Sequence, residues 1–203
     1  MSERTLYGVS SSRAIRSIWA IEEVGVEYEH VPTHFVGDSK QPAYLAINPN
    51  GRVPALVDGD LVLFESMAIN LHLARAYGGD LFPEEPADQA RAVQWSVWAI
   101  SEIEPLQMQL VVEKFFTPDE KRKPGVVERA SKGLERPLAV LNAALSDRAH
   151  LLGDEFSIAD LNVAGVMLLL QLVEFDYTHH ANVKRWADDC YARPSLARAQ
   201  ARD

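Results

Sequence analysis

The sequence predicts a protein in two parts, a first part that mixes strands with helices and a second part that is entirely helical. In the first part, short apolar runs alternate with helical patterns and turn residues. In the second part, apolar residues recur at three- and four-residue spacing. The segment between them carries Pro83, Pro86 and two acidic residues, a composition typical of a linker. We therefore expect domains at 1–80 and 89–203, joined by a linker at 81–88.

The first part is expected to contain four strands. Residues Thr5–Val9 are apolar and bounded by serines, which indicates a strand. Apolar residues at helical spacing follow and stop at Gly25, a residue that commonly ends a helix. The other expected elements are a strand at 26–31, one helical turn around Tyr44, a hairpin of strands at 55–57 and 61–64, and a helix from Ser66 to Tyr77.

The second part is expected to hold one long broken helix and several shorter helices. Pro105 lies inside the apolar pattern of 88–112, and we expect a kink there because proline lacks the N–H that a helix interior needs. A charged segment with two prolines, 114–125, indicates a loop. Helices are predicted at 126–145, at 161–175 behind a capping box of Ser157 and Asp160, and at 183–191.

Composition excludes several classes of function. The net charge of −9 argues against a general nucleic-acid binder and against binding to an anionic membrane. Cys190 is the only cysteine, so an intrachain disulfide is impossible and a reducing, cytoplasmic location is expected. The longest apolar run, 163–173, is too short to span a bilayer, and the first residues lack a signal-peptide pattern.

The most informative stretch runs from residue 47 to residue 66. Pro54 directly precedes an apolar strand, and a cis Val53–Pro54 bond would explain its position and turn the peptide groups of Val53 outward. Glu65 and Ser66 then supply a carboxylate, a hydroxyl and helix-start N–H groups. Together these groups indicate a receptor for a small peptide that carries both an amine and a carboxylate.

The motifs of this chain, taken in their order along the sequence, resemble those of the cytosolic glutathione transferases. The serine-type and bacterial members of that family look nearest. The resemblance rests on Leu6-Tyr7, the serines 10–12, Arg16, Asn48-Pro49, Val53-Pro54, Glu65-Ser66 and the segment 157–160. It implies a thioredoxin-like first domain, an all-helical second domain and glutathione bound mainly by the first. It also implies a homodimer and a role in detoxification.

The resemblance places an active hydroxyl in the serine run. In serine-type members this hydroxyl lies four residues before an arginine of the first helix and five after a strand tyrosine. Both counts, from Arg16 and from Tyr7, give Ser12, with Ser11 second and Ser10 third. The simpler alternative is that Ser12 only caps the helix. The loop has no cysteine, which argues against the members that form mixed disulfides with glutathione.

A hydroxyl at a helix start suits thiol activation. A charge-assisted hydrogen bond contributes roughly 1.5–3 kcal/mol, and the helix field adds about 0.3–1 kcal/mol. Together they can lower a thiol pKa by about one to three units, because ~1.4 kcal/mol is one unit. Glutathione would then react as its thiolate without a general base.

The resemblance also assigns glutathione contacts. It implies that the backbone of Val53, presented by Pro54, pairs with the cysteinyl part, that Glu65 binds the γ-glutamyl amine and that Ser66 binds the γ-glutamyl carboxylate. Three further side chains are weaker candidates for the glycyl carboxylate, and an exposed surface role fits them as well: Arg52, Gln41 and Lys40.

The second substrate, a small hydrophobic electrophile, is expected against the helical domain. Candidate lining residues are Val9, Trp98, Glu102, Met108, Val112, Phe115 and Phe116. Ordinary core packing is the alternative for the apolar ones. The pair His179-His180 has no other ligand near in sequence, so no metal is expected.

Three functions are consistent with these features of the sequence. The first is a glutathione transferase that conjugates an electrophile or reduces peroxides. The second is a non-catalytic interaction module on the same fold. A glutathione-dependent isomerase ranks lower, because those relatives carry a Ser-Ser-Cys motif that this chain lacks.

Overall fold

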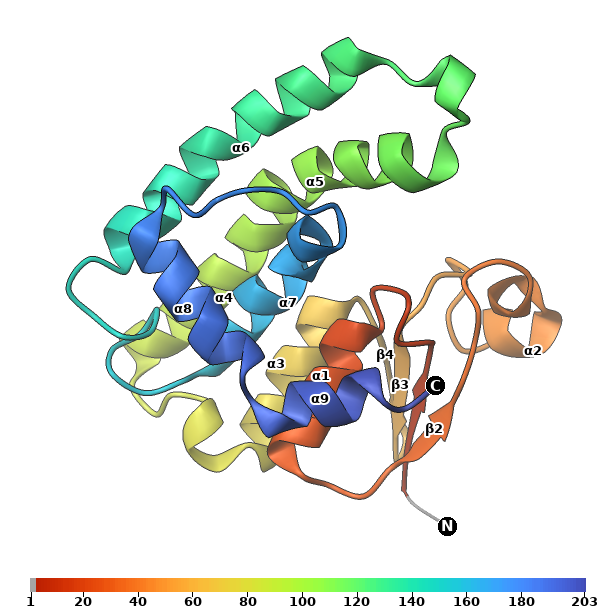
Figure 1. Ribbon diagram of the computed structural model, residues 1–203. Coiled ribbons are helices and arrows are strands. Elements are labelled where there is room, and N and C mark those ends of the chain that lie inside the picture. The colour runs from red at the N-terminus through yellow and green to blue at the C-terminus, as the bar shows by residue number, and fades with distance from the viewer. Residues whose placement is uncertain (1–2) are drawn as a thin grey trace. The chain divides into compact units, whose positions relative to one another are not determined.

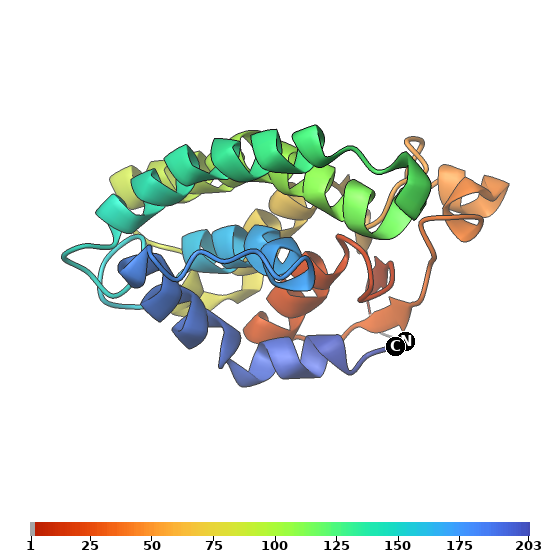
Figure 2. The same ribbon diagram turned by 45° about the horizontal axis from the view of Figure 1, so that its top comes forward.

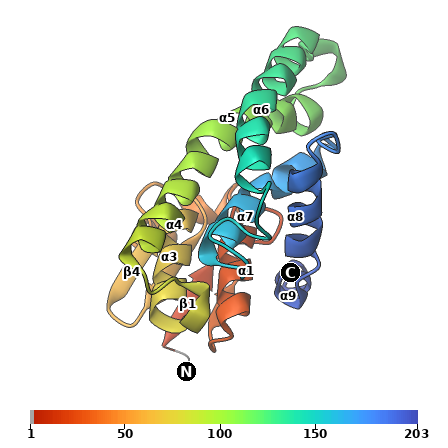
Figure 3. The same cartoon turned by 90° about the vertical axis from the view of Figure 1, so that its left-hand side faces the viewer.

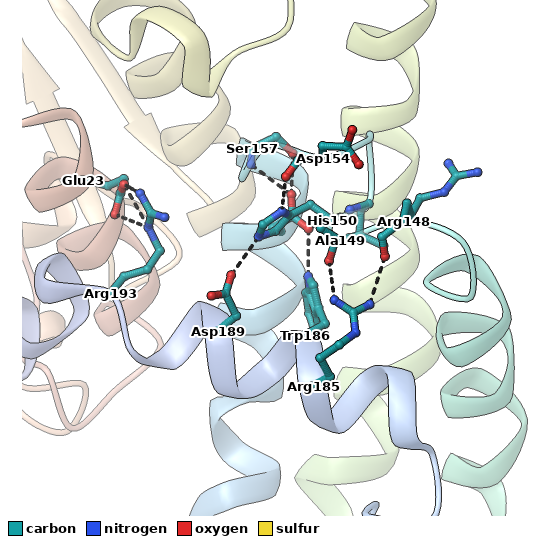
Figure 4. Close-up of polar contacts among 12 residues, drawn as sticks. Glu23, Arg148, Ala149, His150, Asp154, Ser157, Arg185, Trp186, Asp189 and Arg193 are labelled. Carbon is teal, nitrogen blue, oxygen red and sulfur yellow. Dashed lines mark hydrogen bonds and ion pairs between the residues drawn. The ribbon is translucent and has the colours of Figure 1, made fainter.

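A computed structural model describes residues 3–203. The chain forms two compact units, one made of Met1–Glu84 with Ala192–Asp203 and the other of Glu85–Tyr191. The last twelve residues thus differ from the sequence prediction, which assigned them to the helical domain. Long-range polar contacts explain the difference. Trp19 Nε1 donates to Ser195 Oγ at 3.0 Å, and Arg193 pairs with Glu23 (Figure 4).

The first unit is built on a four-stranded mixed sheet in the order β2-β1-β3-β4. Its strands are β1 (Arg4–Tyr7), β2 (Glu29–Val31), β3 (Ala55–Asp58) and β4 (Leu61–Phe64). Strand β1 pairs parallel with β2 and antiparallel with β3, and β3 pairs antiparallel with β4 in the predicted hairpin. β1 is shorter than predicted because Gly8, at a φ of 138°, turns the chain out of the sheet.

Helices cover both faces of this sheet. The helices α1 (Ile15–Val24), α3 (Ser66–Tyr77) and α9 (Pro194–Gln200) lie on one side of it, and the short α2 (Pro42–Leu45) lies on the other (Figure 1). Gly25 ends α1 in a left-handed conformation, as expected. Short 3-10 turns at Asp38–Lys40 and Gly79–Leu81 complete the unit. The predicted α/β class of this unit is confirmed.

The second unit is helical throughout. Its helices are α4 (Pro86–Trp98), α5 (Glu104–Val111), α6 (Pro124–Ala144), α7 (Ile158–Leu172) and α8 (Ala181–Tyr191). Helix α6 lies alongside α5, and α7 contacts α4, α5 and α8 (Figures 2 and 3). None of the helices within residues 3–203 combines the length and apolar character that a bilayer crossing requires.

The expected break at Pro105 takes a specific form. A π-helical segment, Ala99–Ile103, separates α4 from α5, directly ahead of the proline. Pro105 has no N–H to donate to the preceding helical turn, and in an α-helix its ring would clash with a carbonyl of that turn. The wider π-helical turn accommodates both features. A second π-helical segment, Val112–Phe116, and a 3-10 turn, Asp119–Lys121, replace the loop predicted at 114–125.

The buried carboxylate of Asp160 organises the start of α7. It accepts the Ser157 N–H at 2.9 Å and the Ser157 hydroxyl at 2.7 Å, so the predicted capping interaction is confirmed. It also accepts the Leu151 N–H and the Trp186 indole N–H, both at 2.8 Å. Figure 4 shows Ser157 and Trp186 converging on this region beside His150. One carboxylate therefore ties α7 to α8 and to the loop before α7.

Candidate functional site

The serine loop connects β1 to α1. The Ser12 hydroxyl donates to the Val9 carbonyl at 2.7 Å and accepts the Ala14 N–H at 3.1 Å. Because Ala14 is the residue that precedes α1, Ser12 caps the turn ahead of the helix rather than the helix itself. Ser11 is exposed, and the Ser10 N–H donates to the Asp203 carboxylate at 2.9 Å.

Gly8 fixes the position of this loop. A Cβ at Gly8 would lie 2.3 Å from the Cβ of Ala14 and 3.4 Å from the Cβ of Val53. Contacts of 2.3 Å are not tolerated, so only glycine fits between the strand and the helix start. The serine loop therefore begins directly against Val53, one of the residues predicted to bind a peptide.

The turn before Val53 is held by side chains. The Arg52 carbonyl accepts the Tyr44 hydroxyl at 2.6 Å and the Asn48 amide at 2.7 Å. Burial raises the pKa of Tyr44 to about 12, which keeps its hydroxyl protonated as a donor. The Val53–Pro54 peptide bond is cis. Within residues 3–203, no hydrogen bond involves the Val53 N–H or C=O, which leaves both groups for an extended ligand.

Glu65 occupies an unusual backbone conformation between β4 and α3. Its φ is 72° and its ψ is 114°, although it carries a full side chain. Such a conformation costs roughly 1–3 kcal/mol and is concentrated at functional sites. The Glu65 carboxylate is exposed. This backbone conformation places an acidic side chain directly before the first turn of α3.

Ser66 is the first residue of α3 rather than its cap, since Glu65 takes the position before the helix. Ser66 is buried, with 7% of its surface exposed. The first helical hydrogen bond runs from the Ile69 N–H to the Glu65 carbonyl at 3.0 Å, so the N–H groups of 66–68 point out of the helix start. Such groups favour a carboxylate.

The weaker candidates for glutathione contacts have different surroundings. Arg52 and Gln41 are exposed. Lys40 is exposed too, but its ammonium donates to the Gly51 carbonyl and so stabilises the turn. Arg52 and Gln41 thus remain open to a ligand, whereas Lys40 is already engaged.

The predicted acceptor residues separate by exposure. Val9 is buried in the first unit, with 1% exposed. In the second unit, Trp98 and Met108 are half-buried and Glu102 is exposed on the first π-helical segment. The apolar side chains at the second π-helical segment are exposed, Val112 at 43%, Phe115 at 49% and Phe116 at 63%. Core packing therefore does not account for these two phenylalanines.

Sequence reasoning missed a pocket beside this segment. Its volume is about 380 Å³, and its wall includes Leu110, Lys114, Val127, Val173 and Phe175. These residues come from α5, the second π-helical segment, α6 and the chain after α7. Only the packing of these elements brings the residues together, so no local pattern could have indicated the pocket.

Two family models match the chain. The model described as "Glutathione S-transferase, N-terminal domain" matches residues 2–75, and "Glutathione S-transferase, C-terminal domain" matches residues 103–194. The first match includes the serine loop, Val53, Glu65 and Ser66, and the second includes the Asp160 network.

Individual proteins resemble the chain over nearly its whole length. Glutathione S-transferase 4 of Zea mays is 36% identical, with 94% of this chain and 88% of the relative covered. Glutathione S-transferase GstB of Escherichia coli K12 is 31% identical, with 95% of each covered. Among solved structures, the theta class glutathione S-transferase of Xanthomonas axonopodis pv. citri with glutathione bound is 30% identical. Its TM-score is 0.89, with 100% of this chain and 99% of that chain covered.

Proposed function

The chain belongs to the glutathione S-transferase family, and we propose that its Ser12 holds the sulfur of bound glutathione as a thiolate that attacks a small hydrophobic electrophile. The enzyme class follows from the family. The role of Ser12 is supported above all by one contact, the close approach of Gly8 to Val53. That contact joins the loop that carries the hydroxyl to the peptide groups that would bind the cysteinyl residue.

The chemistry of each binding group matches one part of glutathione. The unpaired N–H and C=O of Val53, next to the cis Pro54, suit the main chain around the cysteine. The Glu65 carboxylate suits the γ-glutamyl ammonium. The Ser66 hydroxyl and the N–H groups that open α3 suit the γ-glutamyl carboxylate. Arg52 is the cation proposed for the glycyl carboxylate, and Gln41 is a second candidate for it.

Thiolate formation requires a small movement of Ser12. Its hydroxyl hydrogen now points at the Val9 carbonyl and must rotate toward the sulfur. The exchange gives up a neutral hydrogen bond of about 1 kcal/mol and gains a charge-assisted one of roughly 1.5–3 kcal/mol. The net gain lowers the thiol pKa by about one unit. The thiol proton leaves to water.

Conjugation then needs only a nucleophile and an acceptor. The thiolate donates its electron pair to the electrophilic carbon and forms the C–S bond, while a leaving group departs with its electrons or an adjacent π bond accepts them. We assign the acceptor to the residues predicted for it, with Val112, Phe115 and Phe116 as the exposed apolar ones. Removal of electrophiles in this way is a detoxification reaction, and reduction of peroxides by the same thiolate is an extension of it.

A homodimer is part of the proposal. Strand β4 is an edge strand that exposes Leu61, Val62 and Phe64. Helix α4 exposes Val93 and Val97 on one face. Long exposed apolar edges and stripes mark association surfaces. We place the enzyme in the cytoplasm, because its substrate must be present as the thiol rather than the disulfide.

Substitution of Ser12 by alanine tests the mechanism. We expect the thiol pKa of bound glutathione to rise by about one unit and kcat/KM to fall about tenfold, because ~1.4 kcal/mol corresponds to one unit and to tenfold. Ultraviolet titration of the bound thiolate measures the first quantity. Ser11→Ala is the matched control and should leave both unchanged. An unchanged thiol pKa in the Ser12 variant would remove this residue from the mechanism.

A further inference from the structure

Three potential metal ligands meet in the second unit, whereas the residues proposed to bind glutathione belong to the first. Glu135 lies on α6, and His179 and His180 lie directly before α8. The Nε2 atom of His179 lies 2.9 Å from Glu135 Oε2, and the Nε2 atom of His180 lies 3.3 Å from the same oxygen. The sequence shows the histidine pair alone, because Glu135 precedes it by more than forty residues.

The spacing of these atoms matches a small tetrahedral ion. The two ring nitrogens and the carboxylate oxygen all lie within 4.8 Å of one another. Ligands at about 2.0–2.1 Å from a tetrahedral zinc ion are separated by roughly 3.3 Å. The two nitrogen–oxygen distances, 2.9 and 3.3 Å, are already close to this ligand–ligand distance, so these atoms need little rearrangement.

Hydrogen bonds around the cluster hold its two halves in place. Asn142 follows Glu135 by two turns of α6 and bonds twice to Asn182, through the Asn182 N–H and its side-chain amide, each at 3.0 Å. On the histidine side, the His180 N–H donates to the Tyr177 carbonyl at 3.0 Å. The α6 face and the start of α8 are thus fixed next to each other, which is what a preorganised ligand set requires.

The donor set points to one class of cation. Two imidazoles and one carboxylate favour zinc and similar borderline divalent ions over magnesium or calcium, which prefer oxygen ligands alone. His180 is mostly buried, while the side chains of His179 and Glu135 are about half exposed, at 53% and 48%. Solvent can therefore reach a fourth ligand position.

A hydrogen-bonded network without metal is the simpler alternative, in which each Nε2–H donates to Glu135. That arrangement uses one carboxylate oxygen for both imidazoles and holds the two rings at a tilt of 42° with centroids only 4.3 Å apart. With a metal ion bound, the two imidazole Nε2 atoms would be ligands of the ion and would no longer compete to donate to the same carboxylate oxygen. We propose that Glu135, His179 and His180 bind one zinc-type divalent cation, with water as the fourth ligand.

The bound ion would act as a clip between α6 and the start of α8. An ion that binds only the folded state stabilises it by RT ln(1 + c/Kd), where c is the ion concentration, so the stabilisation grows as c rises above Kd. This role is independent of the proposed transfer chemistry, since none of the three residues belongs to the glutathione or acceptor set. Loss of the ion should therefore leave turnover with glutathione unchanged.

Calorimetric titration of the chelator-treated, tag-free protein with zinc chloride, without glutathione, tests the proposal. We expect one ion per chain and a rise in melting temperature as zinc is added. Glu135→Gln keeps the size of the side chain but removes its charge, and we expect at least about a tenfold loss of zinc affinity. His179→Ala should give a comparable loss.

His34→Ala is the matched control, because His34 is an exposed histidine of the first unit outside this cluster. It should leave zinc affinity and the thermal shift unchanged. Absence of zinc binding to the unaltered protein would overturn the proposal. Equal zinc affinity in the Glu135→Gln variant and the His34→Ala control would overturn it as well, since the ion would then bind elsewhere.

Discussion

The two units each contain a polar cluster, and the clusters differ in where their hydrogen bonds go. In the second unit, buried Asp160 accepts four donors from its own chain at 2.7–2.9 Å. In the first unit, the Val53 peptide groups take part in no hydrogen bond within residues 3–203, and Glu65 presents an exposed carboxylate from a strained backbone.

This difference separates polar groups that hold the fold from polar groups that await a ligand. A buried carboxylate is tolerated only when its lone pairs are satisfied, so Asp160 and its donors behave as one structural element. Peptide groups without partners and a strained acidic residue contribute nothing to folding that other residues could not supply. The close approach of Val53 to Gly8, where the serine loop begins, supports a binding role for the Val53 peptide groups.

The largest expected effect comes from Asp160→Ala. The change leaves four donors of the second unit without their acceptor, and each buried unsatisfied group costs about 1–3 kcal/mol. We expect the free energy of unfolding to fall by at least about 3 kcal/mol, measured by urea denaturation. Glutathione affinity of the molecules that remain folded should not change.

Asn142→Ala serves as the control for that variant, because it removes only one hydrogen bond of the same unit, from the Asn182 N–H to the Asn142 side chain. Its effect on stability should be clearly smaller. If Asp160→Ala unfolded at the same urea concentration as the unaltered protein, the carboxylate would not be the element that holds α7 in place.

Glu65→Gln is expected to weaken glutathione binding and leave stability unchanged, which is the opposite of Asp160→Ala. The charge-assisted hydrogen bond to the γ-glutamyl ammonium becomes a neutral one, and we expect glutathione affinity to fall about tenfold. Stability should stay within about 0.5 kcal/mol, because the side chain is exposed and keeps its shape. Calorimetry with glutathione and urea denaturation measure the two quantities. Unchanged affinity together with lost stability would make Glu65 a structural residue.

Much of this comparison could be predicted from local sequence. The capping pair Ser157 and Asp160, the hairpin around Gly59 and the break before Pro105 depend on residues within a few positions of one another. Such short-range rules act through sterics and nearby hydrogen bonds, which a sequence displays directly. The Val53–Pro54 bond is cis, which is the geometry that explains a proline directly before a strand.

What could not be predicted depends on contacts between distant residues. No pattern near Arg193 indicates that it pairs with Glu23, and therefore the last residues were assigned to the wrong unit. Glu135 likewise lies far from His179 in the sequence, although their side chains meet. The Ser12 hydroxyl donates to the nearby Val9 carbonyl, three residues earlier in the sequence. The residue types alone do not predict this hydrogen bond, because it depends on the conformation of the turn.

The smallest expected effect concerns Asp58, a satisfied carboxylate in the first unit. It accepts His72 Nε2 and the Tyr77 hydroxyl, each at 2.7 Å, and lies 3.2 Å from Arg4 Nε. Burial alone would raise the pKa of Asp58, but the hydrogen bonds from His72 and Tyr77, with the charge of Arg4, outweigh it and hold that pKa below its ordinary value of 3.8.

A lowered folded-state pKa means that the folded protein binds the proton less readily than the unfolded chain. The stabilisation by Asp58 is therefore complete above pH 3.8 and is lost as the pH falls below that value and through the lower folded pKa. We expect Asp58→Asn to lower stability at neutral pH by about 1 kcal/mol, a hydrogen-bond-sized effect, and to flatten this acid limb. Urea denaturation between neutral pH and pH 3 measures both. If the variant lost stability at acid pH as steeply as the unaltered protein, other carboxylates would be responsible for that loss. The hydrogen bonds of Asp58 would then not stabilise the first unit in the way that those of Asp160 stabilise the second.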